Sequence, residues 1–333
     1  MAPTAAEILD RARATLDTDR GARFTRYCID VAMGRKAAVP MGTTDGDYDT
    51  DGWGAGAVAE GSAEFVGLVR ARTVIGRLPR LRRVPFNVAV VRRTGGGVYA
   101  WRGEAGAKIV TALGYEKTRL APRTASAIVV LSRELLSGAP GTLADVQREL
   151  LDGVTAFTDR TFLDPANTGT PGIVPASATA GATAIPSSGD AAEDIRALTA
   201  AVQTALDTTE DVVFVMSETT ALGIATTVAG AFPAGLAGGL FGLVPVLLSA
   251  AAKDNIIAIH GPSILVAEGG VRVDSAEHAA LQMSDSPVEG AQPLVSLWQS
   301  GGRALRVERV INWEVATPGA VQYISGADYG TGS

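Results

Sequence analysis

The sequence predicts an α+β fold, and three patterns support this. Residues 190–293 alternate helical segments with short apolar runs. Residues 143–162 repeat apolar side chains three and four positions apart, which is the spacing of one helix face. Residues 294–315 alternate apolar and polar side chains on both sides of Ser300-Gly301-Gly302, which predicts an extended segment or strand pair with a central kink. A chain of 333 residues can form one large domain or two modest ones.

The N-terminal part predicts two short helices followed by an arm. Residues 4–18 and 21–35 each suit an amphipathic helix. Residues 41–63 are rich in Gly and Asp and offer little to bury, which predicts an extended or poorly ordered segment.

The next segment predicts a basic β-hairpin. Three arginines, Arg80, Arg82 and Arg83, precede a strand-like run at 84–91, and Arg92 and Arg93 follow it. The glycines of residues 94–97 predict a turn, and residues 98–101 begin a return strand. Because an isolated two-stranded hairpin is marginal in water, it should pack on its own domain or on a neighbouring subunit.

The middle of the chain predicts a strand and a long helix. Residues 127–131 read as a strand, and Thr142 is a suitable N-cap for a helix over residues 143–162. Its apolar stripe includes Phe157, and Asp159 falls on the opposite, polar side. The Ala/Thr/Ser/Gly-rich residues 179–189 predict a linker and domain boundary.

The following block predicts an alternating α/β unit. Asp190 caps a helix over residues 191–206, and a second helix spans 217–228. The wholly apolar run 212–216 predicts a central strand. Further strands are expected at 244–248, 256–260 and 263–267. Residues 229–252 are the most apolar stretch, but prolines and glycines interrupt them, so we expect buried loop and strand, not a membrane span.

No constellation of residues predicts a catalytic, cofactor or metal site. The two histidines, His260 and His278, lack a third ligand nearby, and Cys28 is the only cysteine. Asp45, Asp47 and Asp49 resemble a calcium loop, but its sixth position is not Gly and its twelfth is not Glu. The glycine run Gly235, Gly238, Gly239 and Gly242 matches neither the P-loop nor the dinucleotide motif. These absences favour a structural protein over an enzyme.

Composition also favours a protein covered by partners. Charged residues make up 19% of the chain, below the usual ~25%. An alanine-rich, high-GC origin would explain the same shortfall. The net charge of −6 does not predict a nucleic-acid binder, and the N-terminus does not resemble a secretory signal. A lone cysteine forms no intrachain disulfide, which fits assembly in a cytoplasm.

Five segments, in this order along residues 70–325, resemble the major capsid proteins of tailed bacteriophages with the Hong Kong 97 shell fold. They are the basic hairpin ending at Tyr99–Glu104, the strand and following residues 128–136, the long helix with its exit through Gly169–Ile173, residues 279–287, and residues 294–315. None is specific alone, and the ordered set carries the resemblance.

The resemblance implies an architecture. It implies an N-terminal arm at 1–70 that crosses to another subunit and an extended hairpin loop at 71–122. It implies a peripheral domain at 123–184 and 294–320, with a spine helix at about 143–162. It also implies an axial domain at 185–293, rejoined by 321–333, whose central loops would include Gly235, Gly238, Gly239 and Gly242.

The resemblance further implies which residues contact other subunits. Thirteen candidates lie on the hairpin and on the last long segment: Arg80, Arg82, Arg83, Arg92, Arg93, Trp101, Glu104, Lys108, Trp298, Arg303, Arg306, Arg309 and Trp313. Some family members join subunits covalently through a lysine, an asparagine and a glutamate. The lysine position falls on Lys108, but the other two fall on Leu294 and Gly301, so we expect no isopeptide crosslink.

The implied function is a shell of hexamers and pentamers around double-stranded DNA, in a virion. Portal, separate scaffolding and decoration proteins are implied partners, and no membrane or cofactor is expected. The alternatives are an encapsulin-like nanocompartment shell and, more remotely, an α/β enzyme with an unrecognised site.

Overall fold

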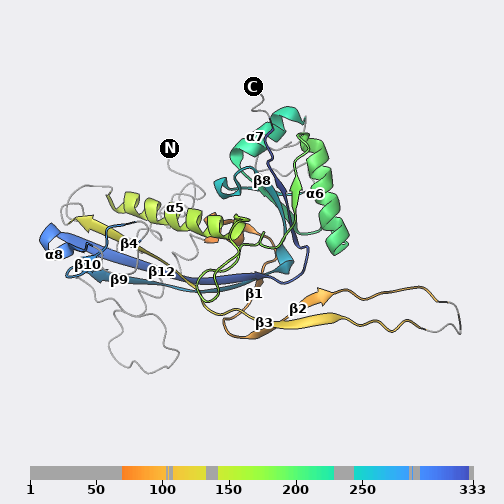
Figure 1. The fold of residues 1–333 in the computed structure, drawn as a ribbon, viewed down its shortest axis with the longest axis horizontal. Helices are drawn as coiled ribbons and strands as arrows, with labels where there is room; N and C mark the ends of the chain where they lie inside the picture. The colour runs from red at the N-terminus through yellow and green to blue at the C-terminus, as the bar shows by residue number, and fades with distance from the viewer. Residues whose placement is uncertain are drawn as a thin grey trace, which may run out of the picture. The chain divides into compact units, whose positions relative to one another are not determined.

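The computed structural model describes residues 70–329, apart from 103, 105–107, 133–141, 229–243, 285–286 and 288–292. The chain divides into two compact units (Figure 1). Unit 1 comprises residues 1–71, 124–155 and 269–310, and unit 2 comprises 72–123, 156–268 and 311–333. The helices predicted at 4–18 and 21–35 and the arm at 41–63 lie outside the described residues. The domain boundaries proposed from the sequence remain a prediction.

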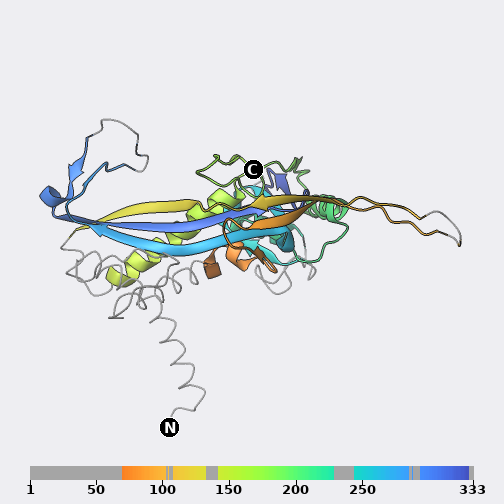
Figure 2. The same cartoon turned by 90° about the horizontal axis from the view of Figure 1, so that it is seen from below.

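Unit 1 is built on long antiparallel strands. β4 (Thr124–Ser132) pairs with β12 (Gly302–Val315), in register from Ser132 opposite Gly302 to Thr124 opposite Val310. β9 (Ile264–Ala276) is the other neighbour of β12, and β1 (Arg82–Arg83), a segment of unit 2, pairs with β9 in the order β1-β9-β12-β4. Helix α5 (Thr142–Leu163) runs along this sheet in Figures 1 and 2. The predicted strand at 127–131 and the long helix are confirmed.

The kink predicted at Ser300-Gly301-Gly302 is confirmed. β10 (Ala280–Leu281) pairs with β11 (Val295–Ser296), and one helical turn, α8 (Leu297–Ser300), follows. Gly301 ends that turn with a φ of 62°, a left-handed conformation that glycine adopts at low cost, and β12 begins at Gly302. Of the two strands that the sequence predicts on either side of the kink, only the second is long.

Unit 2 contains a five-stranded sheet in the order β5-β13-β8-β6-β7. Its strands, in that order, are Ala184–Pro186, Val321–Ser325, Asn255–His260, Val212–Met216 and Val246–Leu248. Every residue of β6 is buried, as its uninterrupted apolar sequence predicts for an internal strand. β5 lies in the segment predicted to be a linker, and pairs in parallel with β13.

Two capped helices cover one face of this sheet. Asp190 caps α6 (Ala191–Leu206) by accepting hydrogen bonds from the backbone N–H groups of residues 192 and 193. Ser217 caps α7 (Glu218–Thr227) in the same way through the N–H of residue 220. Both helices bury their apolar stripes in one cluster: Ile195, Leu198, Val202, Ala221 and Ile224 pack with Phe214, Met216, Ile256 and Ile324.

The opposite face packs on the end of α5 and on α3 (Val74–Arg77). Alternate strand residues Val213, Val215, Ile257 and Ile259 form a second cluster with Phe162, Leu163 and Trp313. Asp159, predicted on the polar side of α5, is buried instead. Its Oδ1 accepts a hydrogen bond from Val74 N at 2.8 Å and its Oδ2 accepts one from Ser249 Oγ at 3.1 Å. Phe157, predicted on the apolar stripe, is 55% exposed.

The basic hairpin exists, but its return strand was predicted in the wrong place. β2 (Ala89–Gly95) pairs with β3 (Gly114–Arg119), and residues 96–113 connect them, so 98–101 belong to the connection. β1 (Arg82–Arg83) is not part of the hairpin, because it pairs in parallel with β9. Short 3-10 turns at Ala250–Ala252 and Gly261–Ser263 complete unit 2.

Candidate assembly surfaces

A polar network fixes the base of the hairpin. Arg92 on β2 donates from Nη2 to Glu116 Oε2 at 2.6 Å and from Nη1 to Glu314 Oε1 at 3.1 Å. Thr118 on β3 donates from Oγ1 to the other oxygen of Glu314 at 2.6 Å. The hydrogen bond to Glu116 raises the pKa of Arg92, against the opposing effect of burial, and the charge of Glu314 adds to it. Both hairpin strands are therefore joined to β12 through one carboxylate.

Apolar packing reinforces this attachment. Val90 of the hairpin and Leu120, which follows β3, are buried with Leu265, Ala267 and Ala316. Asn87 has a φ of 60° and its N–H donates to Leu120 O at 2.9 Å, which closes the base. The hairpin thus starts from a fixed point on unit 2.

The far end of the hairpin exposes apolar side chains. Trp101 and Val110 are 101% and 97% exposed. Five further residues of the same region are also exposed: Val98, Tyr99, Ile109, Leu113 and Tyr115. Figures 1 and 2 show the hairpin extending away from the rest of unit 2. Clustered exposed apolar side chains of this kind mark a contact surface.

The predicted contact arginines near the hairpin have partners within the chain. Arg80 pairs with Asp211 at 3.0 Å, Arg83 pairs with Glu268 at 2.5 Å, and Arg82 donates to Val91 O at 3.2 Å. Arg92 belongs to the network at the hairpin base. Of the predicted residues on the hairpin itself, the exposed ones are Arg93, Trp101, Glu104 and Lys108.

The last long segment divides into an exposed and a buried part. Trp298 is 67% exposed, and its ring lies 4.9 Å from that of His278. Arg303 pairs with Glu277 at 2.7 Å and Arg306 with Glu308 at 3.5 Å. Arg309 and Trp313, predicted as subunit contacts, are buried at 4% and 5% exposure.

Trp313 is a core residue because its neighbours enclose both its ring and its N–H. Its ring packs edge-on against Phe162 at 5.5 Å, and its Nε1 donates to Ala176 O at 2.7 Å. The end of the predicted extended segment at 294–315 therefore lies in a core, since Ile311 and Trp313 are buried in unit 2. Gly235, Gly238, Gly239 and Gly242 lie outside the described residues.

Among the described residues, no group of three or more His, Cys, Asp or Glu could hold a metal ion. Within the same part of the chain, no helix has the length and apolar character needed to cross a membrane.

No family model matches the chain. The chain is 34% identical over 320 residues to the "Capsid polyprotein" of Pseudomonas phage PAJU2, an alignment that covers 89% of this chain and 48% of the relative. Over most of its own length, the chain is therefore similar to a phage capsid polyprotein. It spans about half the length of the curated relative that it matches.

Solved phage structures are similar to this chain in fold. A structure from Microbacterium phage Oxtober96 has a TM-score of 0.54 at 13% identity and covers 88% of this chain and 97% of its own. One from Mycobacterium phage Bobi has a TM-score of 0.53 at 13% identity and covers 76% of this chain and 90% of its own. The fold is the Hong Kong 97 shell fold that the sequence resemblance implied.

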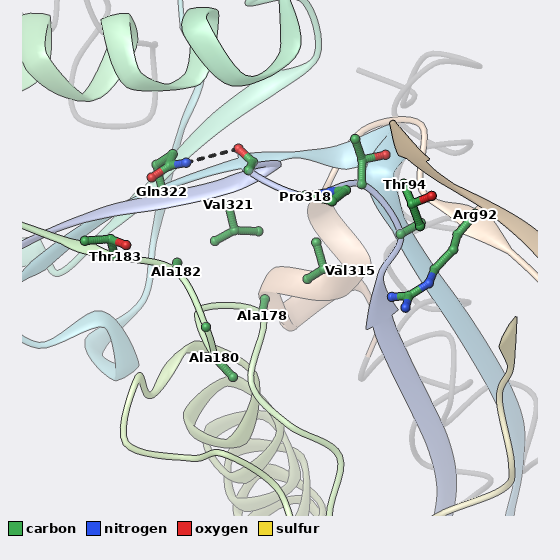
Figure 3. Close-up of a pocket in the computed structure, with 14 residues that line it drawn as sticks. Arg92, Thr94, Ala178, Ala180, Ala182, Thr183, Val315, Pro318, Val321 and Gln322 are labelled. Carbon is green, nitrogen blue, oxygen red and sulfur yellow. Dashed lines mark hydrogen bonds between the residues drawn. The ribbon is translucent and has the colours of Figure 1, made fainter. Parts of the chain in front are cut away.

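A cavity of about 380 Å³ lies beside the base of the hairpin. Arg92 and Thr94 line one side and the loop at 178–183 lines another (Figure 3). Residues 315–322 complete the wall, where Gln322 Nε2 donates to Gly319 O at 3.4 Å. Among the residues that line the cavity, Arg92 is the only charged one, and it already pairs with two carboxylates.

Sequence reasoning missed the network that orients the hairpin. Arg92 and Glu314 are separated by 222 positions, so no local pattern links the two residues. The single available signal was Glu314 itself, an acidic side chain within an apolar and aromatic strand end.

Proposed function

We propose that this chain is a major capsid protein that assembles into hexamers and pentamers of an icosahedral shell around double-stranded DNA. The observation that carries the proposal is the hairpin, which is fixed at its base and exposes an apolar end. The relationship to a capsid polyprotein supports the same conclusion. In this proposal the protein acts structurally and catalyses no reaction.

The physical basis is the incompleteness of the single chain. Permanent subunit contacts typically bury ~2,000 Å² or more, and exposed aromatic side chains such as Tyr99 and Trp101 are the usual anchors of such contacts. A neighbouring copy would cover the hairpin end. The anchoring of Arg92 and Thr118 to Glu314 would fix the direction in which the hairpin reaches.

Several parts of the proposal follow from the resemblance to tailed-phage capsid proteins alone. The hairpin would be the extended loop, α5 the spine helix, and the five-stranded sheet with α6 and α7 the axial domain. The shell would form in the host cytoplasm and become part of the virion, with portal, scaffolding and decoration proteins as partners. Lys108 would form no isopeptide bond, because Leu294 and Gly301 stand where the other two groups are required.

Shortening the hairpin tests the proposal. Replacing residues 96–113 by Asn-Gly would join Gly95 to Gly114 through a two-residue turn and keep the paired strands. Unit 2 should fold normally, because the network at Glu314 and the cluster around Val90 remain, while electron microscopy should show no closed shells.

Normal particles from this variant would contradict the proposal. Particles of the unaltered chain that contain a cargo enzyme in place of DNA would favour a nanocompartment shell.

A further inference from the structure

The paired strands of the hairpin have two faces with different chemistry. Alternate residues of a strand point to opposite faces, and directly opposite residues of an antiparallel pair share a face. One face, which we call the packed face, holds Val90 opposite Thr118 and Arg92 opposite Glu116. It carries the network at Glu314 and the buried cluster, so it attaches the hairpin to unit 2.

The second face, which we call the basic face, holds three cations and no carboxylate. Its three cross-strand pairs are Ala89 with Arg119, Val91 with Lys117, and Arg93 with Tyr115. All three cations are exposed. In the part of the chain that the structure describes, none of them takes part in an ion pair. The basic face therefore presents positive charge that no described carboxylate neutralises.

The charge around this face differs in sign from that of the whole chain. Arg82 adds a fourth exposed cation beside the hairpin, because its Nη1 donates to Val91 O at 3.2 Å. Residues 89–119 hold six basic and two acidic residues, whereas the whole chain has a net charge of −6. One of the two acidic residues, Glu116, is paired with Arg92 on the packed face. Positive charge is thus concentrated on the hairpin of an otherwise acidic chain, which is the charge asymmetry expected of a local polyanion site.

The spacing of the cations suits the phosphates of double-stranded DNA. Lys117 and Arg119 lie two residues apart on one strand, which places them ~7 Å apart along it. Arg93 lies diagonally across from Lys117, at a similar distance of ~7 Å. Phosphates of one DNA strand follow each other every ~3.4 Å along the helix axis, so these cations match every second phosphate. The hydroxyl group of Tyr115 is a further donor of the kind that contacts phosphate.

We propose that the basic face, together with the adjacent guanidinium group of Arg82, binds the phosphate backbone of double-stranded DNA without sequence preference. The inference rests on the proposed function, because a shell that encloses DNA brings the polyanion to the chain. Phosphate contacts supply the affinity of such binding and carry no sequence information. A two-stranded β-ribbon is also narrow enough to enter the major groove.

An acidic protein segment is the other polyanion that could meet these cations. Apart from the ring of Tyr115, the apolar side chains of the basic face are those of Ala89 and Val91. This is little apolar surface for the buried core that a stable protein interface requires. The regular spacing of the cations and the small apolar area therefore favour DNA.

Two variants with equal net charge test the proposal. One carries Arg93→Gln and Lys117→Gln on the basic face, and the other carries Arg160→Gln and Arg196→Gln, at two exposed arginines away from the hairpin. Sedimentation separates the unassembled full chain from particles, and the thermal midpoint checks that each variant is folded. Fluorescence anisotropy then measures the affinity of the unassembled chain for a labelled DNA duplex of about 30 base pairs, between about 50 and 200 mM salt.

We expect the basic-face variant to bind the duplex about tenfold more weakly than the control variant at the lower salt concentration. The slope of log affinity against log salt concentration should become shallower by about 1.8, because each lost phosphate contact contributes about 0.9. The control variant should stay close to the unaltered chain in affinity and in slope. Duplexes of different sequence should bind equally well.

Three outcomes would overturn the inference. Equal affinities and slopes for the two variants would show that binding follows total charge and not the basic face. Failure of the unaltered chain to bind the duplex at low salt would remove the DNA site. Tighter binding of a poly-glutamate peptide than of the duplex would assign the face to an acidic protein. All three are measured on the unassembled chain, so they are separate from the absence of shells, which would contradict the proposed function.

Discussion

Arg92 Nη1 on the first strand of the hairpin donates a hydrogen bond to Glu314 Oε1 on β12 at 3.1 Å, although the two residues are 222 positions apart in the sequence. Glu314 also accepts a hydrogen bond from the hydroxyl group of Thr118 on the second hairpin strand. One carboxylate thus holds both strands at the point where the hairpin leaves unit 2. Without this carboxylate, the attachment of the hairpin to unit 2 would depend on the small apolar cluster around Val90 and Leu120.

Glu314→Gln should loosen the hairpin without unfolding the protein. The change removes the charge that Arg92 and Thr118 share, and because these groups are partly exposed we expect a loss of about 1 kcal/mol. Hydrogen exchange of the β2 and β3 amides should become faster, while β6 and β8 keep their protection. Glu210→Gln is the control, since Glu210 forms no ion pair in the described part of the chain. If the β2 and β3 amides exchange hydrogen at equal rates in the two variants, Glu314 does not hold the hairpin.

Alanine substitutions at two helical glycines should change the free energy of unfolding in opposite directions. A Cβ at Gly223 in α7 would lie 1.9 Å from Tyr329 O, whereas a Cβ at Gly153 in α5 would meet no atom within 4 Å. Gly223→Ala should cost about 1–3 kcal/mol, because backbone must move. Gly153→Ala should add about 0.5–1 kcal/mol from helix propensity. Chemical denaturation of the full chain measures both, and a stabilised Gly223→Ala would refute the close packing of α7 on the C-terminal segment.

Asp194 should make stability sensitive to acid. Its Oδ2 accepts hydrogen bonds from Tyr329 OH and Ser187 Oγ, both at 2.5 Å, and its Oδ1 accepts from Ser188 Oγ at 2.7 Å. Burial opposes the charge, but these hydrogen bonds outweigh it and hold the pKa of Asp194 below its ordinary value. A carboxyl with a lowered pKa in the folded state contributes stability above about pH 4, and this contribution is lost as the pH falls through the folded pKa.

The test compares unfolding free energies between pH 3 and pH 7. Asp194→Asn cannot titrate, so its stability should fall less steeply below about pH 4 than that of the unaltered chain. Tyr329→Phe removes one of the hydrogen bonds, so the acid transition should move to higher pH. Identical pH profiles for all three proteins would show that this carboxylate is not stabilised by its partners.

Trp101→Ala should separate assembly from folding. The side chain is 101% exposed, so its removal should leave the thermal midpoint of the unassembled chain unchanged, while the yield of particles drops. Leu222→Ala on α7 is the matched control, since Leu222 is a 58% exposed apolar residue away from the hairpin. An equal effect of the two substitutions on assembly would argue against a specific contact at the hairpin end.

The sequence predicted best those elements whose signals are local. Asp190 and Ser217 are capping residues, and both helices begin directly after them. The uninterrupted apolar run at β6 identified an internal strand, because only a strand covered on both faces tolerates that composition.

Elements that depend on distant partners were predicted poorly. The glycines at 95–97 have the composition of a tight turn, but the connection between the strands continues to residue 113. The sequence of β3 is too polar to predict a strand. Asp159 was assigned to the solvated side of α5, because its partners, Val74 N and Ser249 Oγ, are 85 and 90 positions away. Which side chains of β2 and β3 share one face of the hairpin could be assigned only once the register of the two strands was known.

The most direct test of the account is electron microscopy of the purified full-length chain, combined with its sedimentation profile. The account predicts closed shells of uniform size that sediment far ahead of the single chain. A chain that remains a compact monomer under all assembly conditions, with the hairpin end protected from exchange by its own domain, would contradict it.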